Sequence, residues 1–212
     1  MKYQCGIFDL DGVLVDTAKY HYLGWKKLAD RLGFPFTEQQ NEALKGISRM
    51  AALDLLLEMG GMSGRFSEAE KAELAAEKNQ YYLEYVSRLE EDELFFGVVE
   101  LFERMKKAGI KIALGSASKN ARLILDRLHI EDYFDFIVDG TLVKKAKPDP
   151  EVFTLSADRL GIPYAECVVF EDSAAGIQAA KTAGMLAVGI GTRENLPMAD
   201  YICRGVGEFE WE

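Results

Sequence analysis

Short apolar runs recur along the chain, and each is bounded by residues that favour turns. They fall at residues 3–10, 110–115, 136–138, 167–170 and 186–190. Amphipathic helical patterns separate the later runs, at residues 98–108, 119–128, 151–160 and 173–183. Continuous apolar runs of this length are typical of strands that are buried on both faces. The alternation therefore predicts an α/β fold, a Rossmann-like parallel sheet covered by helices on both faces.

One long segment breaks this alternation. Helical patterns fill it without an intervening strand-like run, at residues 18–32, 38–45, 48–59 and 67–89. An insertion of helices directly after the first strand predicts two domains, an α/β core of residues 1–17 and 91–212 and a helical cap of residues 18–90. Because ligands of open α/β sheets bind beyond the carboxyl ends of the strands, we expect the cap to cover the active site.

Composition and charge narrow the classes of partner. The chain of 212 residues is 49% apolar and 28% charged, as expected of a globular protein that buries a core without disulfide bonds. Its net charge of -10 argues against nucleic acid and anionic membranes, because both are negatively charged. The N-terminus runs directly into a strand pattern without a signal peptide, and no apolar stretch could span a bilayer, so we expect a cytoplasmic protein.

The cysteines do not indicate a disulfide framework or a zinc site. Cys5, Cys167 and Cys203 are odd in number and widely spaced. Cys5 and Cys167 lie in apolar, strand-like runs, where free cysteines behave as small buried apolar residues. We therefore expect both to be buried free thiols.

Two acids close the first apolar run. Asp9 and Asp11 lie two residues apart, and Gly12 allows a tight turn after them. Two carboxylates this close repel each other unless a cation lies between them or one is protonated. Phosphoryl transfer would use both conditions, with Asp9 binding magnesium and attacking phosphorus and Asp11 carrying a proton to or from a sugar oxygen. The alternative is a turn with two solvated acids.

Small polar residues follow the strand predicted at 110–115. The loop from Ser116 to Asn120 opens a helix, and its hydroxyl groups and free backbone amides suit a phosphate. The alternative here is that Ser118 only caps the helix.

A lysine-rich stretch precedes the helix predicted at 151–160. Lys147 comes directly before Pro148, which restricts its backbone and therefore the directions its ammonium group can take. Lys147 is the candidate for neutralising a transferring phosphoryl group, whereas we expect Lys144 and Lys145 to be solvated.

A second acidic pair follows the strand predicted at 167–170. Glu171 and Asp172 offer the hard oxygen ligands that magnesium prefers. With this pair, four motifs with complementary chemistry fall at the carboxyl ends of predicted strands. Their combination indicates a magnesium-dependent phosphoryl-transfer enzyme.

These motifs resemble, in the same order, the four motifs of the haloacid dehalogenase superfamily, and the resemblance covers essentially the whole chain. It implies that Asp9 is the nucleophile, which becomes an aspartyl phosphate, and that Asp11 is the general acid and base. It implies one magnesium ion per subunit, held by Asp9, the Asp11 carbonyl and Asp172, with Glu171 alongside. It also implies that Ser116 and Lys147 grip the transferring phosphate.

Within the superfamily, the chain is similar to sugar phosphomutases. The resemblance implies a set of substrate-binding residues, namely Thr17, His21, Trp25, Lys45, Gly46, Arg49, Lys78, Asn79, Ser118, Lys119 and Asn120. Among them, Arg49, Ser118 and Asn120 would serve the distal phosphate and the sugar.

The residues of the predicted cap also have simpler interpretations. Thr17, His21 and Trp25 are spaced four apart and share one helix face, which could be a packing surface. Arg49 and Lys78 could be ordinary surface charges.

The function implied is the interconversion of β-D-glucose 1-phosphate and glucose 6-phosphate through an aspartyl phosphate and β-glucose 1,6-bisphosphate, the bisphosphate acting as activator and intermediate. The alternative within the superfamily is a sugar-phosphate phosphatase, in which water accepts the phosphoryl group. A non-catalytic sugar-phosphate sensor could dispense with Asp9 or Asp11, whereas this chain retains both. We expect a monomer that binds small sugar phosphates.

Overall fold

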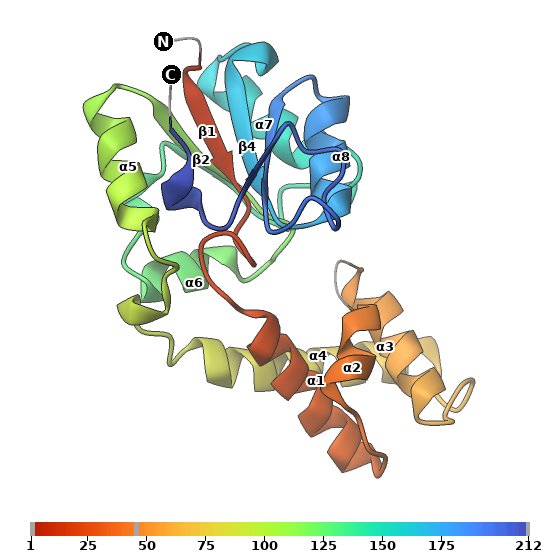
Figure 1. Ribbon diagram of the computed structural model, residues 1–212. Helices are drawn as coiled ribbons and strands as arrows, with labels where there is room; N and C mark the ends of the chain where they lie inside the picture. Colours follow the sequence, from red (N-terminus) through yellow and green to blue (C-terminus); the bar gives the residue numbers. More distant parts are fainter. Residues whose placement is uncertain (1–2, 45–46, 211–212) are drawn as a thin grey trace. The chain divides into compact units, whose positions relative to one another are not determined.

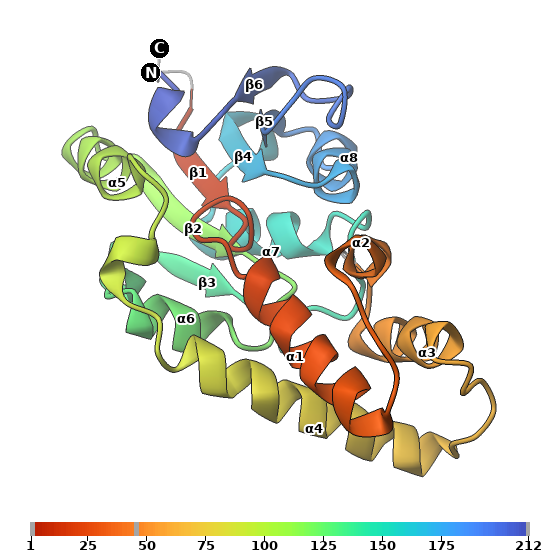
Figure 2. The ribbon, with the colours of Figure 1, turned by 60° about the horizontal axis from the view of Figure 1, so that its bottom comes forward.

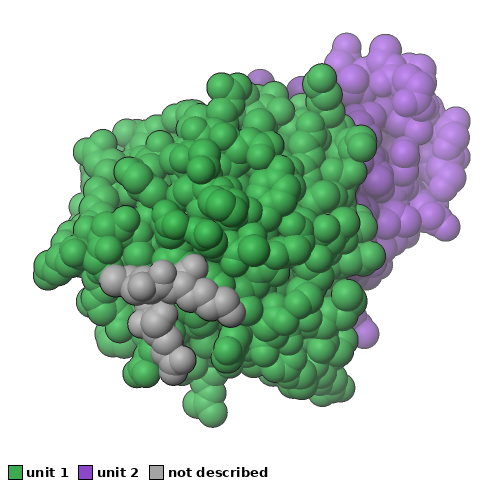
Figure 3. All heavy atoms as spheres, turned by 90° about the horizontal axis from the view of Figure 1, so that it is seen from above, with its two compact units in different colours: residues 1–16, 89–212 green, residues 17–88 purple. Residues whose placement is uncertain are grey.

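The chain forms two compact units in the computed structural model, which describes residues 3–44 and 47–210. One unit consists of residues 1–16 and 89–212 and the other of residues 17–88 (Figure 3). The boundaries between these units lie one or two residues from the domain boundaries expected from the sequence. The predicted substrate residues Lys45 and Gly46 lie outside the described residues.

A parallel sheet forms the centre of the larger unit (Figure 1). Its strands are β1 (Cys5–Phe8), β2 (Lys111–Gly115), β3 (Phe136–Val138), β4 (Cys167–Glu171), β5 (Leu186–Ile190) and β6 (Tyr201–Cys203). Their spatial order is β3-β2-β1-β4-β5-β6, and every pair of neighbours runs parallel. Figure 2 shows β1 between β2 and β4. The parallel α/β sheet predicted from the apolar runs is confirmed.

Helices of the larger unit cover both faces of this sheet. They are α5 (Val98–Lys107), α6 (Ala121–Arg127), α7 (Glu151–Leu160) and α8 (Ala174–Thr182), with 3-10 turns η2 (Glu91–Glu93), η3 (Glu131–Tyr133), η4 (Tyr164–Glu166) and η5 (Val206–Glu208). Alternate strand residues face opposite ways. Ile7 packs in the cluster that contains Phe153 of α7, whereas the ring of Phe8 stacks on that of Phe170 at 4.5 Å and meets that of Phe102 of α5 at 5.1 Å. This two-residue period is what a sheet buried on both faces requires.

The smaller unit is helical throughout its described residues and has a core of its own. It comprises α1 (Ala18–Leu32), α2 (Glu38–Asn41), η1 (Glu42–Leu44), α3 (Arg49–Met59) and α4 (Glu68–Val86). Thr37 and Ser67 form capping boxes at the starts of α2 and α4, which fix where these helices begin. Leu28, Leu53 and Leu56 are fully buried in its core cluster.

Cys5 and Cys167 are buried free thiols, as predicted. They are direct cross-strand neighbours in the β1–β4 pair. None of the described helices combines the length and apolar character needed to cross a bilayer.

The strand at one edge of the sheet, β6, was not predicted from the sequence. It is three residues long, and Tyr201 is 56% exposed, so no apolar run marks it. Asp200 fastens its start to β5, because its carboxylate accepts a hydrogen bond from the Ala187 N–H at 2.9 Å and pairs with Lys181. The Asp200 N–H in turn donates to the Ala187 carbonyl at 2.8 Å.

We expect Asp200→Ala to lower the free energy of unfolding by about 1–3 kcal/mol, because it leaves the Ala187 N–H without its acceptor. Lys181→Ala removes only a partly exposed ion pair and should cost about 1 kcal/mol or less. Urea denaturation of the two variants measures both effects. Equal losses would mean that the ion pair, and not the backbone hydrogen bond, fastens β6.

Candidate active site

Three strands deliver the candidate catalytic side chains to one edge of the sheet. Phe8, the last residue of β1, is in register with Leu114 of β2 and Phe170 of β4. Because these strands are parallel, the residues that follow them emerge side by side. Asp9 follows β1, with its N–H bonded to the Phe170 carbonyl at 3.0 Å, and Ser116 follows β2.

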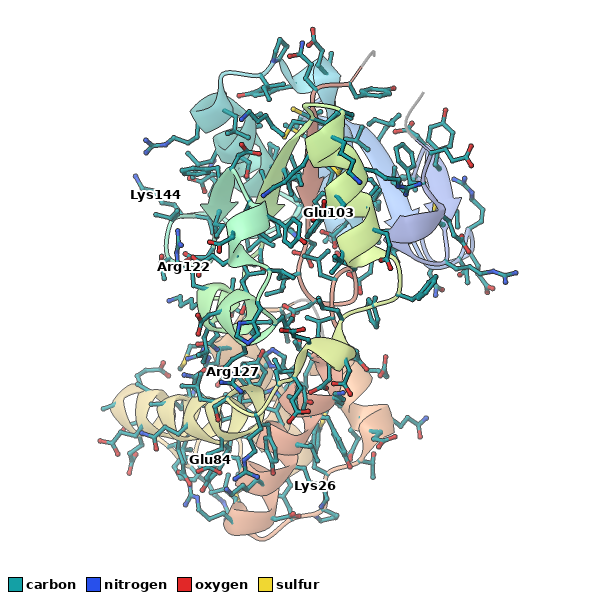
Figure 4. The ribbon with its side chains drawn as sticks, turned by 90° about the vertical axis from the view of Figure 1, so that its left-hand side faces the viewer. Lys26, Glu84, Glu103, Arg122, Arg127 and Lys144 are labelled. Atoms are coloured by element: carbon teal, nitrogen blue, oxygen red, sulfur yellow. The ribbon has the colours of Figure 1, made fainter. Side chains whose placement is uncertain are left out.

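A mostly buried lysine, Lys147, lies between the ends of two of these strands. Lys147 Nζ lies 2.7 Å from Asp9 Oδ1 and 2.6 Å from Glu171 Oε2. Asp9 is 7% exposed and Glu171 is 1% exposed, and the Lys147 side chain is 12% exposed. Lys144, by contrast, points away from the sheet (Figure 4) and is exposed, as predicted. The Lys147–Pro148 peptide bond is cis.

Burial and the charges of neighbouring groups have opposing effects on the pKa values of Asp9 and Lys147. Burial raises the pKa of the Asp9 carboxyl well above its ordinary value, and the Lys147 charge opposes the rise while Glu171 and Asp11 add to it. Burial alone would lower the pKa of Lys147, but the charges of Asp9 and Glu171 outweigh it and raise that pKa. The ammonium group therefore stays protonated between two carboxylates.

Glu171 is held in place from the other side by the start of α8. Its Oε1 accepts hydrogen bonds from the Ser173 N–H at 3.0 Å and from the Ser173 hydroxyl at 2.6 Å. Ser173 also caps α8 by accepting from the Gly176 N–H at 3.1 Å. A Cβ at Gly176 would lie 2.0 Å from Glu171 Cδ, so only glycine leaves room for the carboxylate.

Three carboxylates converge where a metal ion could bind. One oxygen from each of Asp9, Glu171 and Asp172 lies within 4.8 Å of the others. Loss of hydration around the carboxyl group and the neighbouring Glu171 charge raise the pKa of Asp172 to about 7. Hard oxygen donors that repel one another fit a magnesium ion, whose charge would relieve the repulsion. The sequence predicted all three members of this cluster.

Asp11 adds its charge to this cluster without being one of the three side chains that converge. Its charge contributes to the raised pKa values of both Asp9 and Asp172. Gly12 follows with φ of +76°, and a Cβ there would lie 2.0 Å from Asp172 Oδ2. Glycine therefore lets the turn after β1 lie against Asp172.

The loop after β2 is built by hydroxyl groups bonding to backbone amides. Ser116 is 1% exposed, and its hydroxyl accepts from the Ser118 N–H at 3.1 Å. The Ser118 hydroxyl accepts from the Asn120 N–H at 3.3 Å. Asn120 stands at the N-cap of α6 and makes no side-chain cap hydrogen bond, whereas the Ser118 hydroxyl bonds to a backbone amide at the start of this helix, as the capping alternative expected. Lys119, next to Asn120, is exposed.

In the helical unit, a cluster of α1 and α4 side chains surrounds a second buried lysine. Lys78 is 2% exposed, and its Nζ lies 2.8 Å from His21 Nδ1 and 4.6 Å from the centre of the Trp25 ring. An ammonium group can only donate, so Nδ1 accepts and His21 is neutral. Burial, with the charges of Lys78 and Arg49, lowers the pKa of His21 to about 3.

Other predicted residues of this unit have varied surroundings. Thr17 is fully buried, and its carbonyl accepts from the His21 N–H at 3.1 Å. Arg49 begins α3, and burial lowers its pKa. Asn79, next to Lys78, is half-buried. Because Lys78 is buried, the alternative that it is an ordinary surface charge is wrong.

Comparison with known proteins identifies the family. The haloacid dehalogenase-like hydrolase family matches residues 3–184. The chain belongs to this family. Membership agrees with the resemblance inferred from the four motifs and implies the use of magnesium at the carboxylate cluster.

Individual relatives cover nearly the whole chain. A β-phosphoglucomutase of Bacillus subtilis is 44% identical over 97% of this chain and 94% of its own length. The crystal structure of a β-phosphoglucomutase from Clostridium difficile matches with a TM-score of 0.90 and 43% identity, covering 99% of this chain and 94% of the other. A phosphorylated carbohydrates phosphatase of Thermotoga maritima is 35% identical over 84% of this chain and 81% of its own length.

Two glycines that allow close packing around predicted site residues were not predicted from the sequence. A Cβ at Gly24 of α1 would lie 3.2 Å from Lys78 Cε, so glycine allows α1 and α4 to approach around the lysine. A Cβ at Gly140 would lie 2.1 Å from the Ala117 carbonyl oxygen, and the Gly140 N–H bonds to the Ser118 carbonyl at 3.1 Å. A glycine inside a helical pattern was the available signal for Gly24. No signal in the sequence marked Gly140 except its position shortly after a predicted strand.

We expect Gly176→Ala to weaken magnesium binding at least about tenfold, as loss of support behind a metal ligand commonly does. The added methyl group must displace the Glu171 carboxylate from Ser173 and Lys147. Titration calorimetry with magnesium measures the effect, and Gln178→Ala, an exposed position on the same helix, is the control. An unchanged dissociation constant would show that the position of Glu171 does not matter for the metal.

The neutral state of His21 predicts a pH dependence of stability. Burial and the neighbouring charges lower the pKa of His21 from about 6.5 in the unfolded chain to about 3 in the folded one. Between these values unfolding binds a proton, so stability is lost as pH falls, by about 1.4 kcal/mol per unit. Between pH 6.5 and pH 5, the free energy of unfolding of the wild type should fall by about 2 kcal/mol more than that of His21→Gln.

Urea denaturation at the two pH values tests this expectation. The other histidine of the chain is His129, whose side chain is 69% exposed, so His129→Gln is a matched control that should keep the wild-type pH dependence. If His21→Gln also kept the wild-type pH dependence of stability, the neutral His21 would be excluded as the cause of that dependence.

Proposed function

We propose that this protein is a β-phosphoglucomutase, an isomerase that interconverts β-D-glucose 1-phosphate and glucose 6-phosphate. The observation that carries the proposal is the buried Asp9–Lys147–Glu171 group in a chain that is 44% identical to a β-phosphoglucomutase over 97% of its length. The intermediate is β-glucose 1,6-bisphosphate, which also activates the enzyme by phosphorylating it.

Asp9 is the nucleophile in this mechanism. Its carboxylate oxygen forms a bond to phosphorus while the bond from phosphorus to the sugar oxygen breaks, which leaves an aspartyl phosphate. Lys147, within 2.7 Å of the nucleophile, and Ser116 hold the transferring phosphate and balance its charge. A magnesium ion held by Asp9, the Asp11 carbonyl and Asp172, with Glu171 alongside, would add Lewis-acid stabilisation of the phosphoryl oxygens.

Asp11 moves the proton. As the sugar oxygen leaves phosphorus it takes a proton from the Asp11 carboxyl group. The 6-hydroxyl group of a β-glucose 1-phosphate molecule then gives a proton to Asp11 and attacks the aspartyl phosphate, which forms β-glucose 1,6-bisphosphate and frees the Asp9 carboxylate. The bisphosphate turns round and transfers its 1-phosphate to Asp9, which releases glucose 6-phosphate. The two half-reactions together move phosphate between positions 1 and 6 with no net gain or loss of protons.

The helical unit supplies the remaining substrate contacts in this proposal. Thr17, His21, Trp25, Lys45, Gly46, Arg49, Lys78 and Asn79 would bind sugar phosphate from that unit, and Ser118, Lys119 and Asn120 would bind it from the loop after β2. The buried cation at Lys78 supports the assignment, because a desolvated ammonium group interacts strongly with an anion. We propose that the unit acts as a cap, one magnesium ion serves each chain, and the protein works as a cytoplasmic monomer.

The phosphatase alternative is favoured by one observation, the 35% identity to the phosphorylated carbohydrates phosphatase of Thermotoga maritima. The two activities differ in what accepts the phosphoryl group from Asp9. A mutase must keep water away until a sugar hydroxyl arrives, which closure of a cap achieves.

We expect the protein to convert β-glucose 1-phosphate to glucose 6-phosphate in the presence of magnesium and a trace of β-glucose 1,6-bisphosphate. A coupled assay with glucose 6-phosphate dehydrogenase follows the product. Stoichiometric release of inorganic phosphate, with no glucose 6-phosphate formed from glucose 1-phosphate, would exclude the mutase and favour the phosphatase.

The same assay tests the role of Asp11 through Asp11→Asn. This variant should retain magnesium binding and lose turnover by about 10²–10⁴-fold, as loss of a general acid and base does. Asp126→Asn makes the same chemical change at an exposed helix position and should leave turnover unchanged. Near-normal turnover of Asp11→Asn would contradict the proton-transfer role.

A further inference from the structure

The backbone around Lys147 must be placed accurately for its ammonium group to reach two carboxylates at once. The residue lies in the connection between β3 and α7, and no strand or helix contains it. Its Nζ nevertheless meets Asp9 and Glu171 at 2.7 and 2.6 Å. Something other than regular secondary structure must therefore hold this connection.

Glu151, the first residue of α7, bonds back to the connection. Its Oε2 accepts hydrogen bonds from the Lys144 N–H at 2.8 Å and the Lys145 N–H at 2.7 Å. These amides precede Glu151 by six or seven residues, so the carboxylate closes a loop with Lys147 inside it. Two successive backbone N–H groups form an anion-binding concavity, and the start of a helix favours a negative charge.

Asp149 reinforces the same loop. Its Oδ1 accepts from the Glu151 N–H at 3.0 Å, and its N–H donates to the Ala146 carbonyl at 3.0 Å. Its Oδ2 lies 3.2 Å from Lys145 Nζ. The contacts of Glu151 and Asp149 thus fix the chain on both sides of Lys147.

We propose that Glu151 is a positioning residue for Lys147. By holding the Lys144 and Lys145 amides, its carboxylate sets the place from which Lys147 reaches Asp9 and the transferring phosphate. This inference rests on the role of Lys147 in the proposed function. Because displacement of a positioned group by about 1 Å can cost 10²-fold in rate, loss of the Glu151 contact should impair catalysis more than folding.

The test compares three variants. Glu151→Ala removes the acceptor, whereas Glu151→Gln keeps a side-chain oxygen that can accept from both amides. Glu70→Ala is the matched control, because Glu70 Oε2 accepts in the same way from the Ser67 N–H at 2.8 Å, at the start of α4 in the helical unit. The control loses a comparable local contact without touching Lys147.

Glu151→Ala should lower kcat at least about tenfold and leave KM for the sugar phosphate within about twofold, because Lys147 acts on the transferring group. Amide hydrogen exchange at Lys144 and Lys145, followed by NMR, should speed up at least about fivefold, since exchange requires the amide to be released from its acceptor. Glu151→Gln should keep both properties within about threefold of the wild type. Glu70→Ala should leave both unchanged.

Two outcomes would overturn the proposal. One is a Glu151→Ala variant with wild-type exchange at Lys144 and Lys145, and the other is faster exchange with wild-type kcat. Hydrolysis of p-nitrophenyl phosphate, which needs transfer to Asp9 but no sugar recognition, separates this failure from failure of the proposed mutase function. A wild type that hydrolyses this ester without isomerising glucose 1-phosphate refutes the mutase, and the variants' hydrolysis rates then test Glu151.

Discussion

The site depends on the burial of one ammonium group between two carboxylates. Each of these charges loses its hydration, which costs several kcal/mol, about as much as close pairing can return. Lys147 can pair with Asp9 and Glu171 only because their strands are adjacent and parallel. The charges of Asp11 and Asp172 act on the same cluster, so that acidic groups outnumber the ammonium group of Lys147 there. The excess of negative charge explains why a divalent cation completes the site, and why burial and like charges raise the pKa values of Asp9 and Asp172.

The surrounding chain keeps this arrangement from relaxing. The turn after β1 can lie against Asp172 because Gly12 has no side chain, and Gly176 leaves room for the Glu171 carboxylate beside α8. The hydroxyl of Ser173 bonds to Glu171 and its backbone begins the helix behind it. Each of these residues serves both the local backbone and a catalytic side chain. The loops of this site are therefore as constrained as its strands, although they contain no regular structure.

The sequence predicted those parts of the site that follow from strand order, and missed those that depend on packing. The sequence was enough to predict that Asp9, Ser116 and Glu171 lie close together, because the carboxyl ends of parallel strands lie at one edge of a sheet. The acceptor role of Glu151 could not be predicted, since an acid at a helix start usually bonds within its own helix. Lys78 was open to interpretation as a surface charge because the packing of α1 against α4, including the close approach at Gly24, is what buries it. The edge strand β6 carries no apolar run, so its place depends on Asp200 and the neighbouring strand.

Lys147 and Lys78 have different neighbours, and this difference bears on how an acidic protein binds an anionic substrate. Lys147 lies between two carboxylates, so its charge is balanced before substrate arrives. Lys78 lies against the neutral ring of His21 and the face of Trp25, and both contacts stabilise a cation. With a net charge of -10, the chain as a whole repels phosphate. In the proposed function the attraction is therefore local: Lys147 and the metal would attract the group that is transferred, and cations such as Lys78 and Arg49 would attract the rest of the substrate.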